Sequence, residues 1–333
     1  MNANDKQYKA LTLRLGFALL FWFVLLQGSM TLLGIADLAL ESVLSEKAGN
    51  LLYWGFYNAF YFASFMLPVP FFMLISKKIP TQPMFFDLRL PRHFLLSCVA
   101  GVGLITAVGQ INSLLVAPFM GESNESTEML LELIKPGNGY MVVLVFVMLV
   151  IVPPICEEFL FRGLVLGNLL PYGKVVAIVG SALMFAAMHQ SYTQFLYTAM
   201  AGVLLGILYV KSRSIWPPTI LHMLNNLVSF VQMVIMARVS DEMLANRIMI
   251  AMNLLIMFAG LIAFVILVLL SKRKSREQER TQGAFGTTPE RIEQPIKLSD
   301  GMAVKGFFSP SIAVFICLSI VMAVFGLIME HVA

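Results

Sequence analysis

The chain has 333 residues, of which 59% are hydrophobic and only 13% are charged. Soluble domains carry about 25% charged residues, and a mean hydropathy of +0.82 suits a bilayer better than water. The net charge of +4 reflects lysines and arginines on one side of the membrane, so it does not indicate nucleic acid. The cysteines (Cys98, Cys156 and Cys317) lie far apart and form neither a disulfide framework nor a CxxC zinc pattern.

Long apolar segments recur along the chain, and a membrane-spanning helix needs about 20 such residues. The segments are 15–35, 51–75, 94–120, 140–170, 175–190, 195–210, 215–236, 248–270 and 311–329. We therefore expect an all-α, polytopic transmembrane helical bundle of about eight to nine membrane helices, eight if 175–190 and 195–210 do not both span. No small-residue cleavage site follows the first segment, so it is expected to remain as a helix.

The same pattern divides the chain into five regions. They are N-terminal membrane helices (1–136), a core that carries the chemistry (137–236), a further membrane helix (237–270), a basic linker (271–308) and a C-terminal membrane helix (309–333). The linker begins SKRKSREQER and continues with Gly, Thr and Pro, which predicts a flexible segment. Lys and Arg gather in alternate connecting segments, and this bias predicts a cytoplasmic N-terminus.

The first polar group of the core is PPICEEFLFR, residues 153–162. Ionisable residues within membrane segments are costly and indicate a functional site by default. Glu158 and Arg162 are four apart, so on a helix they share a face and can pair. Glu157 points about 100° away from Glu158. Pro153 and Pro154 interrupt the helix before them, which would leave both glutamates near the positive end of a helical half.

Two further groups follow on separate apolar segments. In FAAMH, Phe185 and His189 share a helix face, and in HMLNN, His222 and Asn226 do the same. Asn225 points elsewhere and is expected to make an ordinary polar contact between helices. One difficulty concerns depth, because His189 lies about 22 Å from the start of its helix and His222 only about 10 Å from the start of its own. Strong tilts, or a fifth helix that starts deeper in the protein, would reconcile these depths.

The order EExxxR, FxxxH and HxxxN resembles the intramembrane protease family that includes the Rce1-type CAAX prenyl endopeptidase, often called CPBP or Abi. The resemblance covers about 150–230, all three motifs match, and it makes region 137–236 a CAAX-protease-like catalytic core. It implies that Glu157 is the general base and that His189 helps to hold the attacking water. His222 and Asn226 would donate to the oxyanion, while Glu158 and Arg162 would fix the glutamate helix. These roles agree with the needs of peptide hydrolysis.

The presence of a metal is a separate question. Glu157, His189 and His222 form a zinc-type set of residues, and the family is commonly labelled a metalloprotease. The chain has no HExxH motif, and the three residues come from three different helices. We expect a metal-free water site, with zinc bound by these three residues as the alternative.

The leading hypothesis is an intramembrane endopeptidase with a cavity between the fourth, fifth and seventh helices, acting on a membrane-associated protein or peptide that could be lipidated and CAAX-like. A non-proteolytic scaffold or bacteriocin-immunity protein of the same family is the second hypothesis. An ion- or proton-coupled transporter is the third, although no inverted repeat is evident. The expected location is a bacterial plasma membrane, in contact with lipid and without a nucleic-acid partner.

Overall fold

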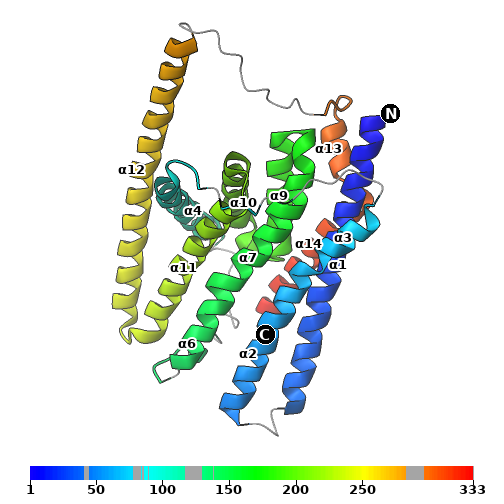
Figure 1. Ribbon diagram of the computed structural model, residues 1–333. Coiled ribbons are helices and arrows are strands. Elements are labelled where there is room, and N and C mark those ends of the chain that lie inside the picture. The colour runs from blue at the N-terminus through cyan, green and yellow to red at the C-terminus, as the bar shows by residue number, and fades with distance from the viewer. Residues whose placement is uncertain are drawn as a thin grey trace.

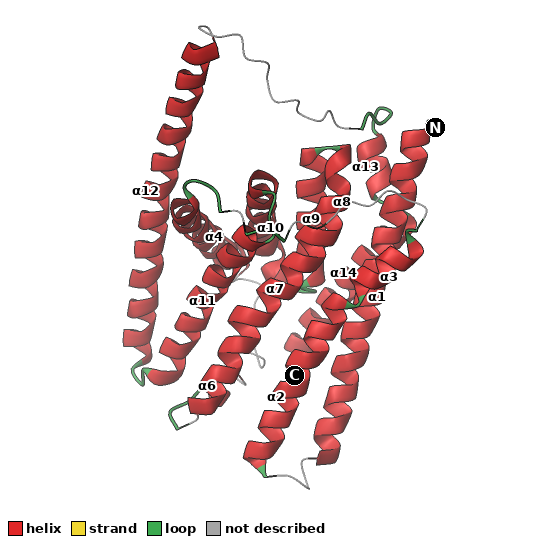
Figure 2. Cartoon of the chain, in the orientation of Figure 1, coloured by secondary structure: helices red, strands yellow, loops and turns green. Residues whose placement is uncertain are grey.

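The computed structural model describes residues 1–40, 45–77, 84, 86–88, 90–116, 130–137, 139–282 and 296–332. All regular structure within these residues is helical, as Figure 2 shows, so the predicted fold class is confirmed. Eight helical segments are long and apolar enough to cross a membrane. The segment 175–190 forms the shorter apolar helix Lys174–Met188 instead, which favours eight spanning segments over nine. The chain is an integral, multi-pass membrane protein.

The N-terminal region consists of four described helices. They are α1 (Ala3–Leu40), α2 (Glu46–Met66), α3 (Pro68–Ile75) and α4 (Phe94–Val116). The single span expected over 51–75 is present as Lys47–Ile75, in which α2 and α3 are joined at Leu67, whose own backbone is helical, and α3 begins at Pro68. Proline has no N–H to donate and is tolerated in the first turn of a helix, so a new helix starts there.

A continuous helical rod, residues 139–172, forms the centre of the molecule. Its parts are α6 (Gly139–Phe146), η2 (Val147–Ile151), α7 (Val152–Glu158), η3 (Phe159–Leu166), α8 (Gly167–Leu169) and η4 (Leu170–Tyr172), of which η2 and η3 are π-helical. The prolines remove N–H donors from the helical ladder, as predicted, because the Leu149 carbonyl receives a side-chain donor instead. The separate helical half expected after them is wrong, because the wider turns of η2 accommodate both prolines without ending the helix. π-helical turns are rare in proteins, and those that occur are often found at functional sites.

The rest of the chain folds back along this rod. Its helices are α9 (Lys174–Met188), α10 (Tyr192–Ser212), α11 (Trp216–Arg238), α12 (Glu242–Gln282), α13 (Met302–Phe307) and α14 (Pro310–Val332). The flexible linker expected over 271–308 is wrong at both ends, because α12 continues to Gln282 and α13 is helical. Lys, Arg, Glu and Gln all favour a helix, and extending an existing helix is far easier than starting one. Residues 283–295 lie outside the described residues.

The two ends of the chain pack together. Trp22 of α1 is completely buried, and its ring contacts Phe65 of α2 at 5.4 Å and Phe315 of α14 at 6.1 Å. Ser311 of α14 donates to the Leu13 carbonyl of α1. In Figure 1, the N-terminus, the end of α12 and α13 lie at one end of the bundle. This arrangement agrees with the predicted grouping of basic segments on one side of the membrane.

Glycine sets the approach of α12 to α4. A Cβ atom built on Gly103 would lie 2.5 Å from the Cα atom of Gly260. The two backbones are therefore in direct contact, as at many helix crossings in membranes where small residues allow close packing. Within two turns before Gly260 on α12, the large apolar side chains Leu255 and Phe258 are exposed. This crossing fixes one wall of a polar cavity described below.

Candidate active site

The ion pair predicted between Glu158 and Arg162 is present at the α7–η3 junction. Arg162 Nη1 lies 2.9 Å from Glu158 Oε1, and both side chains are fully buried. Arg162 Nη2 donates to the Gly202 carbonyl of α10 at 3.2 Å, and the guanidinium lies 4.5 Å from the centre of the Phe185 ring of α9. One arginine thus connects the rod with two other helices through an ion pair, a hydrogen bond and a cation–π contact.

Gly202 allows this arrangement because it has no side chain. A Cβ atom at this position would lie 3.0 Å from Ala182 of α9 and 3.3 Å from the Phe185 ring. The absence of a Cβ atom brings α10 close to α9 and turns a backbone carbonyl toward Arg162. Gly202 therefore packs against Phe185 of the FxxxH motif, although it belongs to none of the three motifs.

His222 lies between the two glutamates. Its Nδ1 is 3.0 Å from Glu158 Oε1, and its Nε2 is 3.7 Å from Glu157 Oε2. An ionised carboxylate only accepts hydrogen bonds, so Nδ1 carries the hydrogen that Glu158 receives. The same carboxylate oxygen receives Arg162, which fixes the orientation of the imidazole ring relative to Glu157.

Glu157 is buried, but its two oxygens have different surroundings. Oε1 accepts a hydrogen bond of 2.6 Å from the Tyr61 hydroxyl of α2. Oε2 is buried and has no hydrogen-bond partner within the described residues. At 3.7 Å from His222 Nε2, it is too far for a good direct bond, and at such separations a bridging water is the usual explanation. Within the described residues, the carboxylate is thus held at one oxygen and has no hydrogen-bond partner at the other.

His189 ends α9, next to Gln190, which has a positive φ of 50°. Its Nδ1 lies 2.8 Å from the Phe185 carbonyl, and because a carbonyl only accepts, Nδ1–H donates and Nε2 bears the lone pair. The His189 and His222 rings both meet the Phe185 ring edge-on, at 5.0 and 5.7 Å between ring centres. The structure therefore brings the two histidines to one site.

The difficulty in depth does not prevent the two histidines from meeting at Phe185. The segment Gly139–Tyr172 has 34 residues, or about 50 Å of helix, which exceeds a hydrocarbon core of about 30 Å. The helix α9 starts at the far end of this rod, and its 15 residues bring His189 back toward the middle. The starts of α9 and α11 are therefore not at the same depth.

Asn226 connects α11 with the π-helical part of the rod. Its side-chain amide donates to the Leu149 carbonyl at 2.9 Å. That carbonyl would normally receive the N–H of residue 153 in an α-helix or of residue 154 in a π-helix, and both residues are prolines without an N–H. Asn226 thus supplies the donor that the two prolines lack. Its neighbour Asn225 donates to the Tyr197 hydroxyl at 2.7 Å, the interhelical contact that was predicted.

Sequence reasoning did not find Tyr61. It lies 96 positions before Glu157, outside every recognised motif. A signal does exist in α2, where Tyr53, Tyr57, Tyr61 and Phe65 recur every four residues on one face. Such a stripe by itself is typical of core packing, and only the structure shows that one of these hydroxyls reaches a buried carboxylate.

The residues proposed as metal ligands do not form a ligand set in this arrangement. Within the described residues, no group of three or more His, Cys, Asp or Glu side chains lies close enough to hold a metal ion. Glu157 Oε2 and His222 Nε2 face each other, but within the described residues no hydrogen bond or ion pair joins either of them to His189. Glu157 and His222 thus form a pair, and the His189 ring lies beside this pair without completing a set of three ligands.

The segment that carries this site is similar to known proteins. Residues 139–228 match the family described as "Type II CAAX prenyl endopeptidase Rce1-like". A protein of Bacillus subtilis (strain 168), named "Putative membrane peptidase YdiL", is 33% identical over 111 residues, which cover 32% of this chain and 42% of that relative. The match thus spans less than half of the relative's length. No solved structure matches the chain.

The matched residues contain all three motifs, from Glu157 to Asn226. The resemblance predicted from them is confirmed, because this central segment matches the Rce1-like family and is similar to a relative named as a membrane peptidase. These matches support a membrane protease in general.

Proposed function

We propose, from the match of residues 139–228 to the Rce1-like family, that the protein is an intramembrane endopeptidase that cleaves a membrane-associated peptide with Glu157 as the general base. One observation carries this proposal: Glu157 has one oxygen fixed by Tyr61 and the other, Oε2, buried, unpartnered and facing His222. A positioned carboxylate beside an imidazole is suited to activate water. A lipidated, CAAX-like substrate is the narrower form of the proposal.

In the proposed reaction, a water molecule lies beside Glu157 Oε2 and His222 Nε2. Glu157 takes a proton from this water while the water oxygen attacks the carbonyl carbon of the substrate. The tetrahedral intermediate collapses when the carbon–nitrogen bond breaks, and the amine leaves with the proton that Glu157 had taken. His189 Nε2, whose lone pair is free because Nδ1 donates to Phe185, accepts a hydrogen bond from the water and helps to orient it.

The oxyanion requires donors, which we assign to Asn226 and to His222 in its doubly protonated form, in which Nδ1–H donates to Glu158 and Nε2–H to the oxyanion. The Asn226 amide has two hydrogens, and the bond to Leu149 uses one of them. The second is the donor offered to the substrate. The bond to Leu149 also orients the Asn226 amide. It can form because Pro153 and Pro154 have no N–H to occupy the Leu149 carbonyl. Glu158 and Arg162 act as positioning residues, because they touch His222 and the helices rather than the reacting atoms.

We propose a water site without a resident metal, because the donor set of the site does not converge on one point. Activity measured after treatment with EDTA and with 1,10-phenanthroline should stay within about twofold of the untreated enzyme, a difference of less than ~0.5 kcal/mol in activation free energy. Loss of activity that added zinc restores would require the alternative, in which Glu157, His189 and His222 move together around the ion.

The decisive experiment is cleavage of a membrane-anchored peptide by the purified protein in proteoliposomes. Glu157→Gln keeps the shape of the side chain and the acceptor for Tyr61, so it should fold normally and lose about 10²–10⁴ in kcat. His189→Ala should also lose activity. The matched control is Glu242→Gln, at an exposed position at the start of α12, which should cleave like the wild type. Undiminished hydrolysis by both site variants would overturn the mechanism.

A non-proteolytic scaffold is the second candidate. It is favoured by the buried contacts of Arg162 with Glu158, with Gly202 of α10 and with Phe185 of α9, which join three helices without any reaction. Under this alternative, Glu157→Gln leaves the biological phenotype of the protein intact. Loss of the phenotype in a folded Glu157→Gln protein selects the endopeptidase.

We further place the protein in a bacterial plasma membrane with its N-terminus in the cytoplasm, as the distribution of Lys and Arg predicts. A cysteine introduced at Asn2 should then be labelled by a membrane-impermeant maleimide only after the cells are opened. Labelling of intact cells would reverse the orientation.

A further inference from the structure

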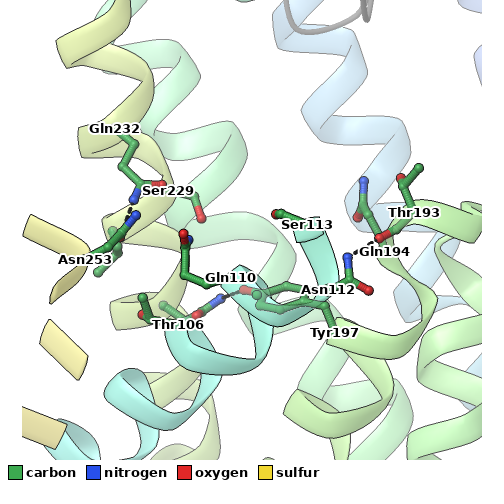
Figure 3. Close-up of a pocket in the computed structure, with 13 residues that line it drawn as sticks. Thr106, Gln110, Asn112, Ser113, Thr193, Gln194, Tyr197, Ser229, Gln232 and Asn253 are labelled. Atoms are coloured by element: carbon green, nitrogen blue, oxygen red, sulfur yellow. Dashed lines mark hydrogen bonds between the residues drawn. The ribbon is translucent and has the colours of Figure 1, made fainter. Parts of the chain in front are cut away.

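A second polar region lies beside the candidate active site. It is a cavity of about 340 Å³, lined by residues of α4, α10, α11 and α12. Of its 13 lining residues, all except Gly109 and Val228 carry a polar side chain, and none is charged. Figure 3 shows these side chains ranged around the space from the different helices. We name it the amide cavity, after the Asn and Gln side chains that line it.

The amide cavity adjoins the candidate active site at two points. On α11, Asn225 lines the cavity and lies three residues after His222, within one helical turn. At the start of α10, Thr193 lines it and lies four residues after His189. Asn112 of α4 donates to the Thr193 carbonyl and closes the wall there. His222 therefore lies within one helical turn of one wall residue, and His189 lies four positions before another, across the turn between α9 and α10.

Several polar groups of the wall have no partner. Gln232 donates to Asn253, and Asn225 donates to Tyr197, so these pairs stabilise the wall itself. In contrast, the side chains of Gln110, Gln194 and Ser229 are exposed and make no hydrogen bond within the described residues. Unpaired amides are costly in a lipid environment, so the space they face must hold water or a polar ligand.

The chemistry of the wall selects the kind of ligand. The wall has no Lys or Arg to pair with a phosphate, and no Asp or Glu to pair with a cation. Asn and Gln offer a donor and an acceptor side by side, which matches the N–H and C=O of a peptide group. A charged residue would enter this cavity without a counter-charge and would lose its hydration.

We propose that the amide cavity binds the backbone of a short, uncharged peptide segment next to the bond that is cleaved. The proposal rests on the endopeptidase function and adds the substrate class: extended peptide without charged residues at the positions that enter the cavity. The volume is at the lower end of the roughly 300–1,000 Å³ typical of ligand sites, which suits a short segment.

Binding can be measured without turnover in the Glu157→Gln background. The probe is a fluorescein-labelled hexapeptide of Ala, Val, Ser and Leu with blocked ends, followed by fluorescence anisotropy with protein in detergent. The double variant Gln110→Leu/Gln194→Leu should weaken binding about tenfold, as expected for two hydrogen bonds of about 0.5–1.5 kcal/mol each. The matched control Gln7→Leu, near the start of α1 and outside the cavity, should bind like the parent.

Two changes to the probe test the chemistry directly. Replacing one backbone amide by an ester removes a donor, and at a recognised position this should weaken binding to the parent but not further to the double variant. A Lys or an Asp in the bound segment should weaken binding at least tenfold. Equal binding by the parent and the double variant, or equal binding of charged and uncharged peptides, would overturn the proposal. So would displacement of the peptide by vesicles that contain a neutral glycolipid, because the cavity would then be a headgroup site.

The two proposals fail in different ways. If the endopeptidase function is wrong, the wild type cleaves no peptide, although binding in the Glu157→Gln background can persist. If only the amide cavity is misassigned, the wild type cleaves peptide and the Gln110→Leu/Gln194→Leu variant has the same KM and the same tolerance of charged residues. A raised KM with an unchanged kcat in that variant supports the cavity as a binding site.

Discussion

The two polar regions of this membrane protein solve the same physical problem in opposite ways. The cluster around Arg162 is charged, fully buried and joined by direct contacts, with Glu157 Oε2 turned toward His222. The amide cavity is uncharged and open, and it leaves several of its side chains without partners. Charged side chains inside a bilayer require fixed counter-charges, whereas neutral amides can remain without a protein partner until a ligand binds. The cluster therefore holds its side chains in fixed positions, whereas the cavity can bind and release a ligand.

The largest effect is expected from breaking the charged cluster. Arg162→Ala leaves Glu158 buried without its cation, and breaking a buried pair in this way costs about 3–5 kcal/mol. We expect little folded protein on size-exclusion chromatography and a large fall in Tm. Arg238→Ala, an exposed arginine in the last turn of α11, is the control and should behave like the wild type. A double variant, Glu158→Gln/Arg162→Met, should recover part of the lost stability, because it removes both charges.

The next effect concerns catalysis rather than folding. Tyr61→Phe removes the hydrogen bond to Glu157 Oε1 and retains the ring. A hydrogen bond to a charged group contributes about 1.5–3 kcal/mol, so kcat/KM should fall by roughly tenfold to a hundredfold. Tyr57→Phe, one turn earlier on the same face, is the matched control. A Tyr61→Phe enzyme with wild-type activity would show that Glu157 does not depend on this hydroxyl.

A smaller effect tests the connection between Asn226 and the prolines. Asn226→Ala leaves the Leu149 carbonyl without a donor and should cost about 1–3 kcal/mol in unfolding free energy. Pro153→Ala restores an N–H to the rod. In a double-mutant cycle, the cost of Asn226→Ala should therefore be smaller in the Pro153→Ala background than in the wild type. If the costs of the two single substitutions simply add, the Asn226 amide does not compensate for the missing proline N–H.

The smallest effect on stability is expected in the amide cavity. Gln110→Leu removes an amide that has no partner in the described structure, so nothing is left unpaired. Its effect on stability should stay within about 0.5 kcal/mol, even though peptide binding weakens. A large loss of stability, measured as a fall in Tm comparable to that of Arg162→Ala, would mean that the cavity wall is structural and would remove the contrast between the two regions.

Much of the fold and part of the site could be predicted from the sequence. Apolar segments of sufficient length give the membrane helices, because the bilayer sets their length. The i, i+4 spacing gives the Glu158–Arg162 pair, because this contact lies within one helix. The three motifs were sufficient to predict the family, which the match over residues 139–228 confirms.

What could not be predicted depends on contacts between distant helices. Tyr61 reaches Glu157 across 96 positions, and Asn226 reaches Leu149 across 77. The amide cavity combines ordinary polar residues of four helices and has no motif of its own. The extent of α12 was missed because a basic, polar sequence can be a linker or the continuation of a helix, and local composition does not decide between them.

The pairing of α1 with α14 also has a consequence for the order of synthesis. Leu13 and Ser311, which share a hydrogen bond, are 298 positions apart. At about 5–20 residues per second, a ribosome needs roughly 15–60 seconds to make that length of chain. Throughout this time Trp22 has no α14 to cover it, and lipid or a helper protein must occupy the place of Phe315. The helix α1, made before the other described helices, thus gains α14 as a neighbour only after this delay.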